Sequence, residues 1–125
     1  MVMAETDTVT KEDQQKINEF SALNSRLNEL QLAIKAKRED MENYEEASNE
    51  LMLADDEEVR YMLGEVFVTM PNETAEEKMQ EATEAAEKAL EEHEAEVENI
   101  RTQMDDLKAA LKVKFGNSIQ LEEDP

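Results

Sequence analysis

Apolar residues recur with a seven-residue period in two long segments, one on each side of the middle of the chain. In the first segment the two rows are Phe20, Leu27, Ile34, Met41 and Ser48, and Leu23, Leu30, Lys37, Tyr44 and Leu51. In the second they are Thr83, Leu90, Val97, Met104 and Leu111, and Met79, Ala86, His93, Ile100, Leu107 and Lys114. Eight of ten positions in the first set and eight of eleven in the second are apolar. This pattern predicts two long coiled-coil helices.

The stretch between the two segments, residues 59–70, has a different pattern. It is the one part of the sequence enriched in β-branched and aromatic residues, and Gly64-Glu65 at its centre suits a two-residue hairpin turn. The pairs predicted to face each other are Leu63 with Val66, Tyr61 with Val68, and Val59 with Met70. One face of this ribbon is then entirely apolar. Because an isolated two-stranded hairpin is marginally stable in water, we expect a partner to cover it.

The ends of the helices carry recognisable signals. Thr10 is a suitable N-cap, Thr74 with Glu77 has the spacing of a capping box, and Gly116 is a suitable residue just after a helix end. With only a hairpin between them, the helices must fold back antiparallel. The fold class expected is mainly α, with two long antiparallel coiled-coil helices joined by a single β-hairpin. The expected segments are 1–9 disordered, 10–58 N-terminal helix, 59–70 hairpin, 71–116 C-terminal helix and 117–125 acidic tail.

Charge changes the picture of possible partners. The formal net charge is −20, which excludes nucleic acid as a direct partner and disfavours an anionic membrane surface. Residues 39–58 contain ten acids and no base, and residues 73–98 contain eleven acids and two bases, whereas 11–38 and 99–115 are mildly basic. The acidity either serves solubility or favours basic neighbours near the hairpin, within a heteromeric assembly.

The sequence offers little catalytic chemistry. It has no Cys, a single His that falls on a heptad row, and no Gly-rich phosphate loop, so we expect no enzyme activity, no cofactor and no ATP use. The acidic run 55–58 lacks the spacing of a calcium loop, so no metal site is expected. We also expect no secretory signal and no membrane-spanning segment. The sequence therefore predicts a binding or assembly protein.

Four blocks of sequence, in this order, resemble the prefoldin family, and within it the β-type subunits. They are Glu-Asp-Gln-Gln-Lys-Ile-Asn-Glu-Phe at 12–20, Leu-Ala-Asp-Asp at 53–56, Gly-Glu-Val-Phe at 64–67 and Lys-Phe-Gly-Asn-Ser-Ile-Gln-Leu-Glu at 114–122. The resemblance covers residues 12–122. One departure is Arg60, a basic residue entering the first strand where a neutral one is expected.

The resemblance implies a heterohexamer of two α-type and four β-type subunits, whose hairpins form an intersubunit β-barrel from which the coiled coils extend. It implies an ATP-independent holdase that binds unfolded or nascent actin and tubulin through the coiled-coil tips. Delivery of these substrates to the cytosolic chaperonin follows from the same resemblance. So does a cytoplasmic location, and a nuclear one is allowed. The remaining partners would be two α-type and three further β-type subunits.

The resemblance also assigns roles to residues of this sequence. The implied assembly residues are Val59, Tyr61, Leu63, Gly64, Val66, Phe67 and Val68. The implied substrate-binding tip residues are Ile17, Phe20, Leu23, Leu111, Phe115, Ile119 and Leu121. Because Ile17 and Phe115 lie one residue off the heptad rows, we expect a splayed coil to present them at the surface. The alternative is that tip residues only close the end of the seam, in a structural coiled-coil scaffold or spacer without direct substrate capture.

Overall fold

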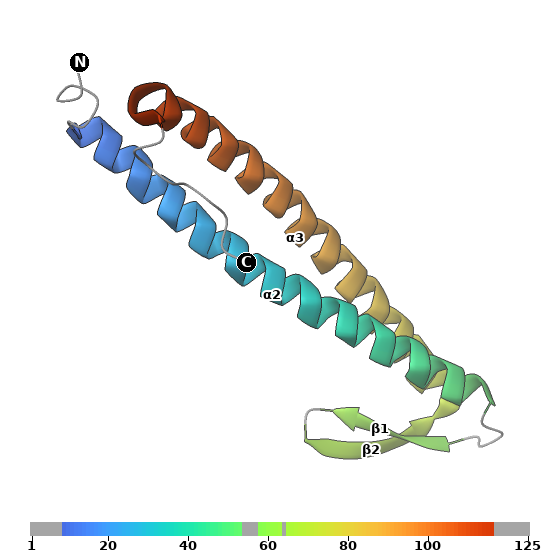
Figure 1. The fold of residues 1–125 in the computed structure, drawn as a ribbon. Coiled ribbons are helices and arrows are strands. Elements are labelled where there is room, and N and C mark those ends of the chain that lie inside the picture. The colour runs from blue at the N-terminus through green and yellow to red at the C-terminus, as the bar shows by residue number, and fades with distance from the viewer. Residues whose placement is uncertain (1–8, 54–57, 64, 117–125) are drawn as a thin grey trace. The chain divides into compact units, whose positions relative to one another are not determined.

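The computed structural model describes residues 9–53, 58–63 and 65–116 of the 125 in the chain. Helix α2 (Lys11–Leu53) and helix α3 (Asn72–Phe115) are joined by strands β1 (Glu58–Leu63) and β2 (Val66–Pro71), as Figure 1 shows. The predicted mainly α fold with one antiparallel hairpin is therefore confirmed. The chain divides into two compact units. We call residues 1–33 with 93–125 the terminal unit, and residues 34–92 the hairpin unit.

The heptad rows form the interior of both units. Every position in the four rows is buried or half-buried, as a coiled-coil seam requires. In the terminal unit the seam contains the three largest fully buried side chains, Leu27, Leu30 and Leu111. The buried apolar side chains of the hairpin unit are Ile34, Met70, Ala75, Met79 and Ala86, two of which are alanines. The terminal unit therefore has the bulkier core.

Two of the predicted helix ends are confirmed, one by its capping hydrogen bonds and the other by the backbone conformation of its glycine. The Thr10 N–H donates to Asp13 Oδ2 at 3.0 Å, and the Asp13 N–H donates to Thr10 Oγ1 at 3.1 Å. This reciprocal pair is a capping box, and it satisfies N–H groups that have no partner inside the helix. At the other end of the chain, α3 ends at Phe115 and Gly116 has a φ of +57°. Glycine adopts this left-handed conformation without steric cost.

The hairpin has the predicted register, with Leu63 opposite Val66, Tyr61 opposite Val68, and Val59 opposite Met70. Gly64, the expected turn glycine, lies outside the described residues. The ladder is one pair longer than expected, because Glu58 in β1 also pairs with Pro71 in β2. Proline has no N–H to donate, but a two-stranded sheet has only edge strands, where proline is tolerated.

Two boundaries therefore need correction. The first helix was expected over 10–58, but Glu58 is the first residue of β1 and the helix described ends at Leu53. The second helix begins at Asn72, so Thr74 lies inside its first turn and is not the N-cap. The Asn72 side-chain Nδ2 donates to the carbonyl oxygen of Leu51 at 3.2 Å. This contact ties the start of α3 to the last turn of α2.

Candidate assembly hairpin and helix-end site

The hairpin exposes large apolar side chains on both of its faces. Met62 and Phe67 lie on one face and are 54% and 52% exposed. Val66 and Val68 lie on the opposite face, which also carries the half-buried Val59 and Tyr61. Among the residues that the structure describes, nothing covers these exposed side chains. Contiguous exposed apolar surface on both sides of a ribbon is typical of an interaction site.

Arg60, the basic residue that departs from the resemblance, has a structural partner. Its guanidinium carbon lies 5.0 Å from the centroid of the Phe67 ring, a distance typical of a cation–π contact. Arg60 pairs directly with Thr69, so Phe67 occupies the diagonal position on the same face. The predicted register places these two residues on one face, although their contact was not predicted. The contact helps to order an aromatic side chain that is otherwise half exposed.

The implied tip residues are mostly in the interior of the terminal unit. Phe20, Leu111 and Phe115 are 5%, 1% and 7% exposed, and Ile17 and Leu23 are half-buried. The expectation that Phe115 is presented at the surface is therefore wrong for this conformation. In this structure these side chains pack at the end of the seam, and their role in substrate binding stays a prediction. Ile119 and Leu121 lie outside the described residues.

A polar cluster holds the two helix ends together at this site. The Lys114 ammonium, in the last turn of α3, donates to the same Asp13 Oδ2 that accepts the Thr10 N–H. It also lies 5.5 Å from the centroid of the Phe115 ring. We call Thr10, Asp13 and Lys114 the helix-end clasp. Asp13 takes part both in the cap of α2 and in the ion pair with α3. These partners account for the burial of this charged residue, which is only 7% exposed.

The clasp changes the acidity of its carboxyl group. The hydrogen bond from Lys114, followed by the one from the Thr10 backbone, lowers the pKa of Asp13 from 3.8 to about 2. Both interactions favour the charged form of the carboxyl group, and they outweigh the opposing effect of desolvation. Asp13 is therefore ionised at any physiological pH, as its contact with the Lys114 ammonium requires.

A second ion pair joins the helices of the terminal unit. Arg26 Nε donates to Glu96 Oε2 at 2.7 Å and Arg26 Nη2 donates to Glu96 Oε1 at 3.1 Å, and Glu29 is a further partner of the guanidinium. These hydrogen bonds raise the pKa of Arg26 and lower the pKa of Glu96. Exposed ion pairs stabilise proteins little, but this two-point geometry fixes which residues lie opposite each other.

The clasp gives a prediction for stability against pH. Because the folded-state pKa of Asp13 is below its ordinary value, its stabilising contribution is complete above pH 3.8 and is lost as the pH falls through about 2. Wild type should therefore be more stable than Asp13→Asn at neutral pH, and the difference should shrink over that interval. Denaturant unfolding at a series of pH values measures this difference. Asp105→Asn removes an exposed carboxylate from the same unit and controls for net charge. A difference between wild type and Asp13→Asn that does not change with pH would contradict the role of the clasp.

The described residues offer neither a metal site nor a membrane-spanning helix. They contain no group of His, Cys, Asp and Glu side chains arranged to hold a metal ion. Across the same part of the chain, neither helix has a stretch apolar enough to span a membrane. The apolar hairpin and the clasped helix ends are therefore the features that need a functional explanation.

Comparison with known families decides what kind of protein carries these two features. The sequence profile of a family described as "Prefoldin subunit" matches residues 14–118, which include the hairpin, all of α3 and all but the first three residues of α2. The chain belongs to the prefoldin family. This is the family that the four sequence blocks resemble. The two middle blocks lie inside the matched residues, and the first and last blocks overlap the two ends of the match.

Curated prefoldin relatives match almost the whole chain. Prefoldin subunit 4 of Homo sapiens is 40% identical over 123 residues, covering 97% of this chain and 92% of its own length. Prefoldin subunit 4 of Saccharomyces cerevisiae is 37% identical, covering 91% and 89% respectively. A probable prefoldin subunit 4 of Drosophila melanogaster is 36% identical, covering 91% and 83%. The chain is therefore a prefoldin co-chaperone subunit, and this family is not a known enzyme class.

Proposed function

We propose that this chain is a β-type subunit of a heterohexameric, ATP-independent prefoldin holdase. In this proposal two α-type and three further β-type subunits complete the hexamer. The complex binds unfolded or nascent actin and tubulin at the coiled-coil tips and delivers them to the cytosolic chaperonin. The proposed compartment is the cytoplasm, with the nucleus as a second location.

The observation that carries the assembly part of the proposal is the two-faced apolar hairpin. Its exposed side chains have no cover within the described chain, and a single two-stranded ribbon is marginally stable alone. Pairing with strands of neighbouring subunits would cover its faces and satisfy its open edges. The described part of the chain has one hairpin, which agrees with the β-type class that the sequence blocks indicate.

The capture part of the proposal requires the helix ends to change conformation. Phe20, Leu111 and Phe115 are buried, so they contact an unfolded chain only after the ends of α2 and α3 separate. Helix termini are the places where local unfolding costs the least free energy. Several tips acting together would hold a client through individually weak contacts.

Replacement of tip residues tests the capture part. Ile17, Phe115, Ile119 and Leu121 are all changed to Ser, and hexamer formation is followed by native mass spectrometry. We expect normal assembly but weaker suppression of actin aggregation, because the apolar contacts with the client are lost. Light scattering after dilution of unfolded actin measures the suppression.

The matched control for this experiment is Leu32→Ser with Val113→Ser, which removes apolar side chains that are 71% and 89% exposed and off the seam. Thermal unfolding of both hexamers separates lost contacts from lost stability. If the tip variant suppresses aggregation as well as wild type does, this subunit acts as a structural spacer and its neighbours do the capturing.

A further inference from the structure

A groove runs between α2 and α3 within the hairpin unit, with a volume of about 710 Å³. On α2 it is lined by residues from Arg38 to Met52, and on α3 by residues from Glu76 to Leu90. The lining positions recur every three or four residues on each helix, so they form one continuous face of each. From Met41 to Met52 this face is about 16 Å long at the usual rise per residue, which equals three helical turns.

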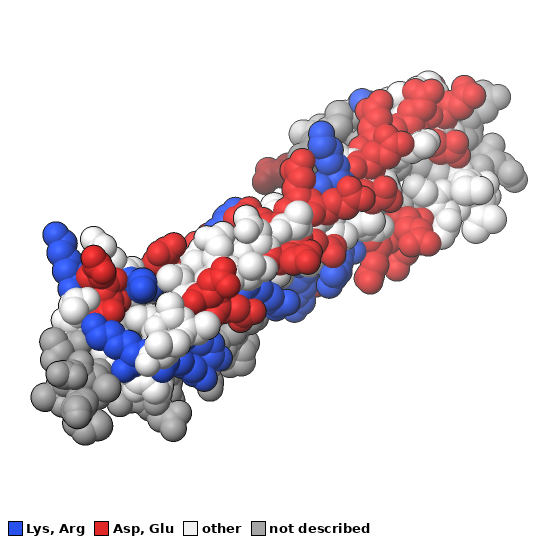
Figure 2. Space-filling view, turned by 90° about the horizontal axis from the view of Figure 1, so that it is seen from above, with Lys and Arg blue, Asp and Glu red and all other residues white. Residues whose placement is uncertain are grey.

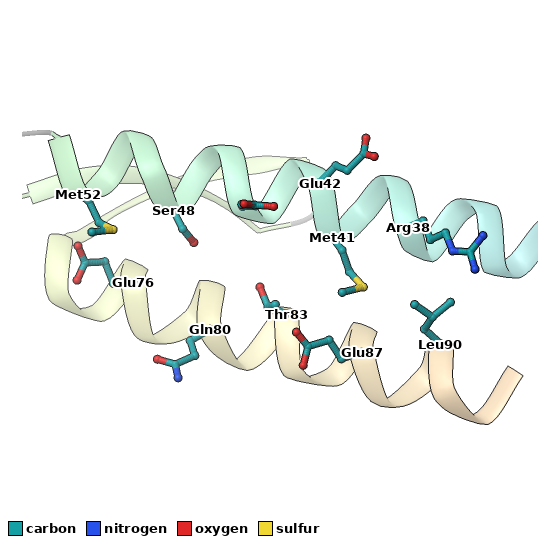
Figure 3. Close-up of a pocket in the computed structure, with 11 residues that line it drawn as sticks. Arg38, Met41, Glu42, Ser48, Met52, Glu76, Gln80, Thr83, Glu87 and Leu90 are labelled. Atoms are coloured by element: carbon teal, nitrogen blue, oxygen red, sulfur yellow. The ribbon is translucent and has the colours of Figure 1, made fainter. Parts of the chain in front are cut away.

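The groove exists because two seam positions carry small polar residues. Figure 3 shows Ser48 from α2 and Thr83 from α3 pointing into the space between the helices. In the terminal unit, large apolar side chains such as Leu27 and Leu111 occupy seam positions and are fully buried. Serine and threonine are too short to fill the equivalent space, and both are only half-buried. The hairpin unit therefore has a seam that its own side chains do not fill.

The remaining lining residues are apolar or acidic, apart from Arg38 and Gln80. Met41 from α2 and Leu90 from α3 both point into the gap in Figure 3, and Met52 lies at the end of the groove next to the hairpin with 74% of its surface exposed. Methionine adapts to many apolar shapes and is common on binding surfaces. The carboxylates of Glu45, Glu76 and Glu87 add negative charge along the same groove.

Arg38 is the one cation among the lining residues, and it lies at the end of the groove away from Met52. Glu45, Glu76 and Glu87 are exposed and make no ion pair within the described part of the chain. The charge around them is predominantly negative, since residues 39–53 carry six acids and no base, and residues 73–92 carry eight acids and two bases, Lys78 and Lys88. Figure 2 shows this excess, with Asp and Glu predominating over the part of the molecule that carries the hairpin. A ligand that brings positive charge would relieve the repulsion.

We propose that this groove binds a basic amphipathic helix of about three turns from a partner protein. Its apolar side chains would enter the gap above Ser48 and Thr83 and contact Met41, Met52 and Leu90. Its Lys or Arg side chains would pair with Glu45, Glu76 and Glu87. In this mode of recognition an amphipathic helix lies in an apolar groove, and its contact residues are three, four and seven positions apart. The site uses none of the tip residues, so it does not depend on the capture function.

The test measures binding of a labelled peptide to the full-length chain by fluorescence anisotropy. The probe is a peptide of about eighteen residues with Leu on one helical face and Lys on the other. Glu45→Gln with Glu76→Gln and Glu87→Gln should weaken its binding about tenfold, since three exposed ion pairs are lost. The matched variant Glu46→Gln with Glu50→Gln and Glu81→Gln removes the same charge from exposed positions outside the groove, and it should change binding less than about threefold.

Further arms of the experiment test the apolar contacts. Met52→Ser removes an exposed side chain without disturbing the core and should weaken binding about threefold. A peptide of the same composition, with Leu and Lys mixed over all faces of the helix, should bind the wild-type chain weakly. Its affinity should match that of the probe for the triple-Gln variant of Glu45, Glu76 and Glu87. Equal losses in the two triple-Gln variants, or full affinity for the scrambled peptide, would show attraction to overall charge and would overturn the proposal.

Discussion

Replacing Phe67 and Val68 with Asp should prevent this chain from assembling into the proposed prefoldin hexamer. The two side chains point to opposite faces of β2, and both are exposed in the single chain, at 52% and 38%. If strands of neighbouring subunits cover the hairpin, each new carboxylate is buried without a partner, at a cost of roughly several kcal/mol. Native mass spectrometry of co-expressed subunits should then show complexes that lack this chain.

Matched variants make this result specific to the hairpin. Ser21→Asp with Ala22→Asp adds the same two charges at exposed positions of α2, and it should leave the hexamer intact. Phe67→Asp and Val68→Asp made singly identify which face lies deeper in the interface, because the deeper face tolerates the charge less. Normal stoichiometry for the double variant would refute the assembly role of the hairpin.

Replacing Leu111 with Ala should destabilise the chain by about 2–5 kcal/mol, although the prefoldin resemblance makes Leu111 a substrate-binding residue. Leu111 is only 1% exposed and is one of the largest fully buried side chains, with Leu27 and Leu30. Truncation removes buried apolar area and leaves a cavity that the surrounding helices fill only in part. Chemical denaturation followed by far-UV circular dichroism measures the loss.

The control for this truncation is Leu32→Ala, which removes the same atoms from a side chain that is 71% exposed. A surface change of this kind should alter the free energy of unfolding by less than about 0.5 kcal/mol. An equally small effect at Leu111 would mean that the seam is already open in solution, and that Leu111 is available for capture without any conformational change.

The features predicted from the sequence are those fixed by local chemistry. The cap at Thr10 depends on Asp13 three residues away, and the end of α3 depends on Gly116 alone. The strand register follows from the position of the turn, and the seam follows from a periodicity of seven. In each case the determining residues are neighbours in the sequence. The Thr74 prediction was wrong because the spacing of a capping box recurs by chance in segments rich in Thr and Glu.

The features not predicted depend on how the two helices are aligned. Asp13 and Lys114 are 101 residues apart, and a heptad pattern shows which faces meet without showing which side chains lie level. The burial of Phe115 depends on the same alignment, so the residue was expected at the surface. Ser48 and Thr83 were assigned to the seam, but the volume left between them depends on how closely the helices approach. The sequence pattern does not contain that distance.

The clasp makes the two free helix ends thermodynamically dependent on each other. One carboxylate, Asp13, serves as a cap for the first turn of α2 and as an acceptor for the last turn of α3. If the end of α3 unwinds, Lys114 leaves and the cap of α2 loses the interaction that orders it. If α2 frays, Lys114 loses its acceptor. The two ends should therefore fray together, so that the apolar side chains between them become exposed in one cooperative step.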